Sequence, residues 1–400
     1  MSESAPGLSA PVQAPPAGQA PPAGQAPTWG AATEATVQLL DAAGALVEND
    51  RTAEFLPVVE VLDDDTLRQF HRDMVRTRRF DDEAGNLQRQ GQLALWVPSH
   101  GQEGAQVGSA HAARPQDHLF PSYREHAVGL VRGIDPVDVV RLLRGTTHGG
   151  WEPSERGNFH LYTLVIGSQT LHATGYAMGI ALDGDHASGD PERDQAVVAY
   201  FGDGATSQGD VSEALVFAAS YQTPEVFFLQ NNQWAISVPV ATQSRTPLYK
   251  RGEGFGIPST QIDGNDVLAA YAVTRRDLDA ARAGGGPRFI EALTYRIGAH
   301  TTSDDPTKYR TDAETQSWIA RDPITRFEAY LRSRGAGDAF FAEVEAEARD
   351  LAADVRRRTL ALERPSSDLM FDHVYSEEHP RITEQKEWLA NYESSFGDSE

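Results

Sequence analysis

The alternation of apolar and polar positions in the middle of the chain predicts strands separated by helices. Short apolar runs occupy residues 196–201 and 226–229, and between them residues 211–221 carry apolar side chains at helical spacing. Each run has the length and composition of a strand that is buried on both faces. A helical pattern at 267–283 followed by an apolar run at 288–295 repeats the arrangement. We therefore predict an α/β fold, a doubly wound and mostly parallel sheet.

Helical periodicity flanks this region on both sides. Residues 63–80 begin with acidic side chains, which favour a helix N-terminus, and continue with apolar residues at helical spacing. Residues 341–355 carry apolar side chains at alternating steps of three and four, which predicts a helix in the C-terminal part of the chain. The arginines at 356–358 suit the end of that helix, so we interpret them as a solvated helix terminus.

The first residues differ in composition from the rest of the chain. Residues 1–35 are rich in Ala, Pro, Gly and Gln and include a tandem repeat of Ala-Pro-Pro-Ala-Gly-Gln. A segment with so little apolar surface has nothing to bury, so we expect a disordered, dispensable tail; a docking arm is the alternative. We expect residues 36–375 to form one α/β domain with its C-terminal helices, and residues 376–400 to form a separate C-terminal segment.

Charge and composition exclude several classes of function. The chain has 35 Lys and Arg against 58 Asp and Glu, a net charge of −23. Such a chain repels nucleic acid and anionic membranes, so we expect neither as a partner. There is no cysteine, which excludes disulfides, thiolate metal sites and cysteine nucleophiles. The sequence shows no transmembrane run and no secretory signal, and we expect a cytoplasmic protein.

Two polar loops follow the two central predicted strands, so they should meet at the carboxyl edge of the sheet. Gly202 and Gly204 in the first loop allow the backbone to approach a phosphate, and the helix that begins near residue 210 favours an anion at its N-terminus. Asp203 in the first loop and Asn232 in the second are hard oxygen ligands of the kind that Mg²⁺ prefers. Gly-Asp-Gly followed at this spacing by Asn-Asn matches the thiamine diphosphate signature.

Five further motifs, together with the two loops, carry a resemblance to a known family, in which the same motifs occur in the same order along the chain. They lie at residues 101–104, 120–125, 166–169, 262–266 and 295–310. Over about residues 62–327 the chain resembles the alpha subunit of the decarboxylating component of 2-oxo acid dehydrogenase complexes. The resemblance implies oxidative decarboxylation of a small 2-oxo acid, transfer of the acyl group to a lipoyl carrier, and the cofactors thiamine diphosphate and Mg²⁺.

The resemblance also implies roles for individual residues. The metal ligands would be Asp203, Asn232 and the main-chain carbonyl of Trp234. The residues that would contact the cofactor are Tyr123, Arg124, Ser168, Thr170, Gly202, Gly204, Ala205, Asn232 and His300. Some family members have an arginine where this chain has Gln230. Neutralisation of the diphosphate would then depend more heavily on Arg124 and the metal.

His300 is the candidate catalytic residue. It opens a polar loop after the predicted strand that ends near Tyr295. Without the other motifs, the favoured interpretation would be a histidine of a surface loop. The resemblance implies that it contacts the cofactor and assists acyl transfer to the lipoyl group by proton transfer. Some relatives carry a phosphorylated serine in this loop, but Thr301 stands at the first such position, so we infer no kinase switch.

The resemblance further implies that one chain forms only half of an active site. A glutamate from a second, related domain activates the cofactor in this family, and this chain has room for one such domain. The implied partners are a beta subunit, in an α2β2 heterotetramer, and a lipoyl-bearing acyltransferase core. The hints on substrate conflict: the run at 300–305 favours branched-chain 2-oxo acids, slightly preferred here, and 101–103 favours pyruvate. The alternatives are an acetoin-type dehydrogenase alpha subunit and a non-catalytic cofactor-binding homologue.

Overall fold

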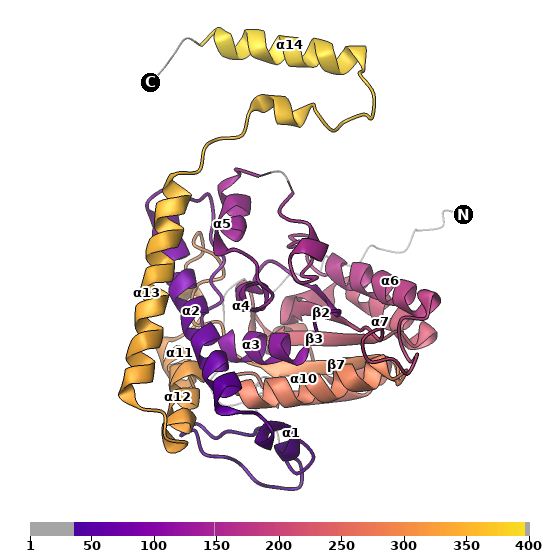
Figure 1. The fold of residues 1–400 in the computed structure, drawn as a ribbon, viewed down its shortest axis with the longest axis vertical. Helices are drawn as coiled ribbons and strands as arrows, with labels where there is room; N and C mark the ends of the chain where they lie inside the picture. The colour runs from indigo at the N-terminus through magenta and orange to yellow at the C-terminus, as the bar shows by residue number, and fades with distance from the viewer. Residues whose placement is uncertain (1–35, 148, 397–400) are drawn as a thin grey trace, which may run out of the picture.

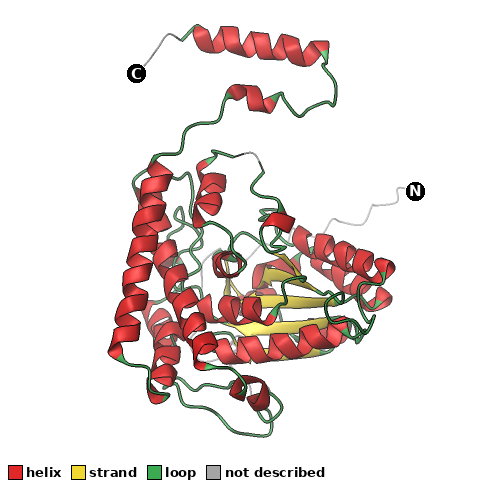
Figure 2. Ribbon diagram, in the orientation of Figure 1, coloured by secondary structure: helices red, strands yellow, loops and turns green. Residues whose placement is uncertain are grey.

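The centre of the protein is a parallel five-stranded sheet (Figure 1). A computed structural model describes residues 36–147 and 149–396. In spatial order the strands are β1 (His118–Phe120), β2 (Val197–Gly202), β3 (Glu225–Asn231), β7 (Arg288–Leu293) and β6 (Ser259–Asp263). A two-stranded antiparallel ribbon consists of β4 (Trp234–Ala235) and β5 (Val238–Pro239). Figure 2 shows the main sheet as a layer between helices, so the predicted α/β class is confirmed.

Side chains of the central strands alternate between two apolar cores. Val198 and Tyr200 of β2 belong to the larger core, whereas Val197, Ala199 and Phe201 of the same strand belong to the smaller one. Successive strand residues point to opposite faces, so a strand covered on both sides must be apolar at every position. The apolar runs at 196–201 and 226–229 therefore correspond to β2 and β3, as predicted.

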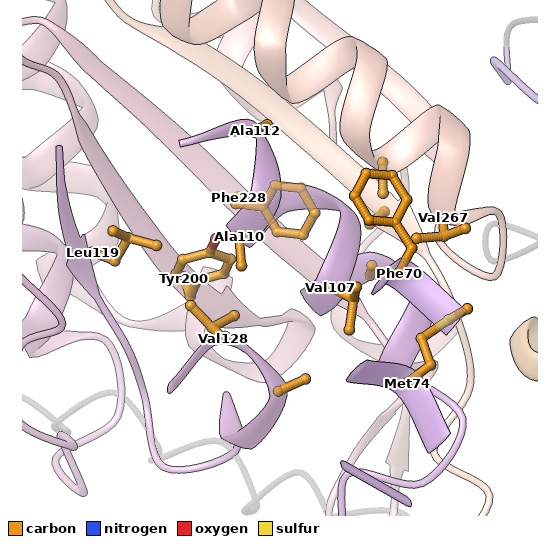
Figure 3. Close-up of a cluster of buried hydrophobic side chains, with 14 of the residues drawn as sticks. Phe70, Met74, Val107, Ala110, Ala112, Leu119, Val128, Tyr200, Phe228 and Val267 are labelled. Atoms are coloured by element: carbon orange, nitrogen blue, oxygen red, sulfur yellow. The ribbon is translucent and has the colours of Figure 1, made fainter. Parts of the chain in front are cut away.

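The larger core lies between the sheet and a set of long helices. These are α2 (Asp64–Arg89), α3 (Glu103–Ala112), α10 (Val267–Arg282), α12 (Pro323–Ser333) and α13 (Asp338–Leu360). Figure 3 shows side chains from α2, α3 and α10 meeting Tyr200 and Phe228 of the sheet. Close contact between α3 and α10 depends on Gly108, because a Cβ atom there would lie 2.5 Å from the carbonyl oxygen of Val267.

The opposite face of the sheet is covered by α6 (Ser168–Asp183) and α7 (Gly209–Tyr221). Ala173 and Ala177 of α6 pack with Val211 and Leu215 of α7 over the strands. The remaining short helices are α1 (Leu56–Glu60), α4 (His126–Val131), α5 (Pro136–Arg144), α8 (Val240–Gln243), α9 (Lys250–Gly254), α11 (Asp312–Ile319) and the 3-10 turns η1 (Pro153–Glu155), η2 (Asp203–Ser207), η3 (Pro306–Lys308) and η4 (Ser367–Met370). The helices predicted at 211–221 and 267–283 are thus α7 and α10.

The end of the chain leaves the body of the protein after α13. Figure 1 shows the last helix, α14 (Pro380–Ser394), apart from the sheet and its helices. No residue of α14 is buried, and Lys386 connects it to Asp368 of η4 at 3.2 Å. The proposed boundary at residue 375 stays a prediction, and residues 1–35 lie outside the described part. No helix in residues 36–147 and 149–396 is long and apolar enough to cross a membrane.

Candidate cofactor site

A cavity of about 260 Å³ lies at the carboxyl edge of the sheet. Its walls come from the loops after β2 and β3, from the start of α3, from residues 122–125 and 166–169, and from the loop after β7. The first two loops are neighbours because β2 and β3 pair in parallel, with Gly202 opposite Gln230. Chain progression across the sheet reverses between β3 and β7, which is where open α/β sheets bind ligands.

Most of the residues predicted for the site line this one cavity. They are Tyr123, Arg124, Gly202, Asp203, Gly204, Ala205, Asn232, Trp234 and His300. The structure does not bring Ser168 and Thr170 into the lining. Their hydroxyls donate to the carbonyl oxygens of Val165, at 3.0 Å, and Gly167, at 2.7 Å.

The segment at 166–169 does reach the cavity, but through other residues than the two predicted. Ile166, Gly167 and Gln169 line it. Helix α6 begins at Ser168, and the rotation of its first turn decides which side chains face the site. That rotation could not be read from the sequence, which explains the difference.

The loop after β2 has the shape expected of an anion site. A Cβ atom on Gly204 would lie 2.8 Å from the Cβ of Ala235, so only glycine lets the two loops approach this closely. Helix α7 follows at Gly209, and its N-cap residue Gln208 lines the cavity without capping the helix. The positive end of the helix dipole therefore favours a negative ligand here.

The three predicted metal ligands present oxygen atoms in the same wall. The carboxylate of Asp203 is 2% exposed and accepts from Nε2 of Gln243 at 2.9 Å. Burial raises its pKa, and within the described residues no lysine or arginine forms a salt bridge with it. The carbonyl oxygen of Trp234 accepts from Arg296 at 3.1 Å, which leaves its second lone pair for another partner. A buried carboxylate that has no salt-bridge partner among the described residues, beside carbonyl and amide oxygens, fits Mg²⁺.

His300 is held by two guanidinium groups. Its Nδ1 lies 3.1 Å from Nη2 of Arg124 and 3.4 Å from Nη1 of Arg296. A guanidinium can only donate, so Nδ1 must accept and the ring proton sits on Nε2. Burial and these two positive charges lower the pKa of His300 to about 3. The side chain is therefore neutral near pH 7 and offers one N–H donor.

Glu125 and Gln230 form a buried pair that the sequence reasoning missed. Nε2 of Gln230 donates to one carboxyl oxygen of Glu125 at 2.7 Å, and Ser122 donates to the other at 2.8 Å. Burial is the main reason why the pKa of Glu125 is raised. The motif at 120–125 was the available signal for Glu125. The position where some relatives carry an arginine thus holds an amide bonded to a buried acid.

Gln102, Gln208 and Ile236 also line the cavity without having been predicted. Gln102 belongs to the motif at 101–104, which could have suggested it. Gln208 and Ile236 follow the two cofactor loops directly, and their closeness to those loops in the sequence was the only signal for them.

Comparison with known proteins decides the family. A family model described as "Dehydrogenase E1 component" matches residues 71–359. The chain belongs to this family. The enzyme class predicted from the sequence, a 2-oxo acid dehydrogenase, is therefore confirmed, and the thiamine diphosphate dependence of E1 dehydrogenases agrees with the predicted organic cofactor.

Individual E1 relatives are similar over most of their length. The chain is 46% identical to "3-methyl-2-oxobutanoate dehydrogenase subunit alpha" of Mycobacterium tuberculosis, over 88% of this chain and 93% of that protein. It is 38% identical to "Pyruvate dehydrogenase E1 component subunit alpha" of Acholeplasma laidlawii, over 82% and 94%. A protein of the same description from Staphylococcus epidermidis is 35% identical, over 90% and 93%.

Proposed function

We propose that this E1 chain is the alpha subunit of an enzyme that oxidatively decarboxylates a branched-chain 2-oxo acid and passes the acyl group to a lipoyl carrier. The observation that carries the substrate is the 46% identity to a subunit named for 3-methyl-2-oxobutanoate, which exceeds the 38% and 35% identities to two named for pyruvate. The run at 300–305 favours the same substrate class. Pyruvate is the second candidate.

In this proposal, the residues that bind the cofactor lie on loops at the ends of the strands. Arg124 supplies positive charge, and Gly202 and Gly204 bring backbone close to the diphosphate beside the N-terminus of α7. Asp203, Asn232 and the Trp234 carbonyl would hold Mg²⁺, whose positive charge would help to neutralise the diphosphate. Tyr123 and Ala205 complete the wall. For Ser168 and Thr170, a contact with the cofactor is supported by the family resemblance alone, because neither residue lines the cavity.

Thiamine diphosphate, when bound, supplies the electron sink for loss of carbon dioxide. The catalytic group of this chain is His300. Arg124 and Arg296 fix its ring by donating to Nδ1, so Nε2–H is available to donate a hydrogen bond that stabilises negative charge during acyl transfer. Because its pKa is about 3, His300 acts from the neutral form.

A second polypeptide is part of the proposal. Family members described as alpha subunits imply a beta subunit and an acyltransferase core, and we infer an α2β2 heterotetramer in which the beta subunit completes each site. The lipoyl-bearing core would receive the acyl group. The cytoplasmic location expected from the sequence belongs to the same proposal.

Steady-state kinetics of the chain co-purified with its beta subunit test the substrate. We expect kcat/KM for 3-methyl-2-oxobutanoate to exceed that for pyruvate and for acetoin. A higher value with pyruvate would move the enzyme to the pyruvate class, and a higher value with acetoin would move it to the acetoin class. Calorimetric binding of thiamine diphosphate without turnover of any of the three would identify a non-catalytic homologue.

A further inference from the structure

Gln102 occupies a fixed position at the start of α3. Gly101 before it has φ +95°, and a Cβ atom there would lie 2.4 Å from the carbonyl oxygen of Tyr295. Glu103 after it accepts from the Gly101 amide at 2.9 Å and from Nε of Arg78 at 2.8 Å. The backbone on both sides of Gln102 is therefore held tightly, and its side chain is directed before any ligand binds.

The two ends of the Gln102 amide have different surroundings. The side chain lines the cavity and is 1% exposed. Its Oε1 accepts from Nδ2 of Asn232 at 3.3 Å. Its Nε2 is buried and has no hydrogen-bond partner among the described residues. A buried amide donor without an acceptor costs about 1–3 kcal/mol, so such a group calls for an explanation.

Two other glutamine amides that line the cavity use their donors within the protein. Nε2 of Gln169 donates to the carbonyl oxygen of Tyr200 at 2.9 Å, and Nε2 of Gln230 donates to Glu125 at 2.7 Å. Gln102 differs because the described residues offer its Nε2 no acceptor. It lies beside Asn232, a proposed metal ligand, and it is the N-cap residue of α3, whose positive dipole end favours an anion.

We propose that Gln102 is a further cofactor-binding residue whose Nε2 donates to an oxygen of the bound diphosphate. Its Oε1 accepts from Nδ2 of Asn232 and so turns Oδ1 of Asn232 away from Gln102. That oxygen accepts from the backbone amide of Trp234 at 3.3 Å and keeps a second lone pair for the metal. This inference rests on the proposed function, because it takes thiamine diphosphate as the ligand. It extends the binding site from the two strand-end loops to the N-terminus of α3.

The test compares Gln102→Met with Gln261→Met in the assembled enzyme after removal of cofactor. Methionine has a similar length and no hydrogen-bond donor. Gln261 in β6 is also a buried amide, but it is not part of the cavity lining and donates to Glu291 at 3.1 Å. Isothermal titration calorimetry would measure the affinity for thiamine diphosphate and for inorganic diphosphate, each with Mg²⁺, and thermal unfolding would report stability.

We expect Gln102→Met to weaken both ligands by about 10- to 100-fold, the effect of a hydrogen bond to a charged group. The Tm of the cofactor-free enzyme should stay close to that of the parent, because the variant removes an unpartnered donor but also removes the acceptor of Asn232 Nδ2. Gln261→Met should lower the Tm and leave both affinities within about twofold, as a lost internal bond does. Gln102→Glu keeps the acceptor for Asn232 but places an anion beside the diphosphate, so binding should be weaker than in the methionine variant.

Several results would overturn the inference. Parent-like affinity in Gln102→Met or in Gln102→Glu would show that Nε2 does not contact the diphosphate. Loss of thiamine diphosphate affinity with unchanged affinity for inorganic diphosphate would place the contact elsewhere on the cofactor. If the parent enzyme itself failed to bind thiamine diphosphate, the proposed function would fail instead, so the two failures are distinguishable.

Discussion

The carboxyl edge of the sheet and the C-terminal arm, defined as residues 361–396, differ in the kind of side chain that lacks its usual surroundings. At the sheet edge, polar groups such as Asp203 and Glu125 are buried around a cavity. In the arm, large rings are exposed: Trp388 is 64% and Tyr392 50% accessible. Buried polar groups call for a polar or ionic ligand, whereas exposed apolar rings call for an apolar surface. The polar groups at the sheet edge are therefore suited to the cofactor, and the exposed rings of the arm are suited to an apolar surface.

The two regions also differ in how they are held. The loops at the sheet edge are anchored by strands buried on both faces, so a side chain there can be changed without loss of the fold. Helix α14 of the arm has no buried residue, so it should contribute little to the stability of the body. Changes at the sheet edge should therefore alter binding and chemistry, and changes in the arm should alter neither in the isolated chain.

The largest effect is expected from His300→Ala. Loss of the Nε2–H donor should reduce acylation of a lipoyl domain by about 10²- to 10³-fold, the usual contribution of a hydrogen-bond donor directed at developing negative charge. Binding of Mg²⁺ and thiamine diphosphate should remain, because the proposed ligands lie on other loops. The measurement is lipoyl-domain acylation by the variant assembled with its beta subunit at saturating cofactor. A rate within about twofold of the parent would remove His300 from the mechanism.

Asp203→Ala should give the next largest effect. Removal of the one carboxylate in the proposed metal set should weaken Mg²⁺-dependent cofactor binding by at least about 100-fold, while thermal stability of the cofactor-free chain stays near that of the parent. Asp183→Ala, at the exposed C-terminus of α6, is the control and should bind normally. Calorimetry with and without Mg²⁺ decides between a metal ligand and an ordinary buried acid, for which the two variants would bind alike.

Gly108→Ala should destabilise the body that supports the sheet edge. The added methyl group would push α3 away from α10, and overpacking of this kind costs about 1–3 kcal/mol. Gly179→Ala in α6 meets nothing within 4 Å and should be neutral or stabilising, since alanine is the better helix former. Denaturant unfolding of the isolated chains measures both. Equal stability of the two variants would show that the α3–α10 contact can relax.

Glu225→Gln tests a buried acid at the opposite edge of the sheet. Burial raises the pKa of Glu225 to about 8 from an ordinary value of 4.5, so the folded protein binds this proton more tightly than the unfolded chain. That contribution is fully present below pH 4.5 and is lost as the pH rises towards 8. The variant should therefore be more stable than the parent at pH 8–9 and similar at pH 4.5. Glu213→Gln on the exposed face of α7 should show no such pH-dependent gain in thermal melts.

Deletion of residues 376–400 should have the smallest effect. Because α14 buries no residue, the Tm of the isolated chain should change by less than about 2 °C. A larger loss of stability would mean that the arm packs on the body, and the contrast between the two regions would disappear. The same truncation in the assembled enzyme shows whether the exposed rings serve association, by analytical ultracentrifugation.

The sequence predicted those parts of the structure that follow from local pattern. Strands β2 and β3 were visible because burial on both faces makes them continuously apolar. Strand β1 has three residues, too few for a pattern, and β6 is largely polar because Gln261 bonds to Glu291 inside the sheet. In the cavity lining, Gly202, Gly204, Asp203 and Asn232 were predicted from the spacing of their motifs. Gln102 and Glu125 were missed because their roles arise only when distant segments meet.

The pair formed by Gln230 and Glu125 changes how substitutions among relatives should be compared. An arginine at position 230 would bring a positive charge, but beside Glu125 it would also favour ionisation of that acid and so create a negative one. The ionised carboxylate would then offset the charge of the arginine. The net charge at this site therefore depends on positions 125 and 230 together. A comparison of relatives at position 230 alone gives a wrong estimate of that charge.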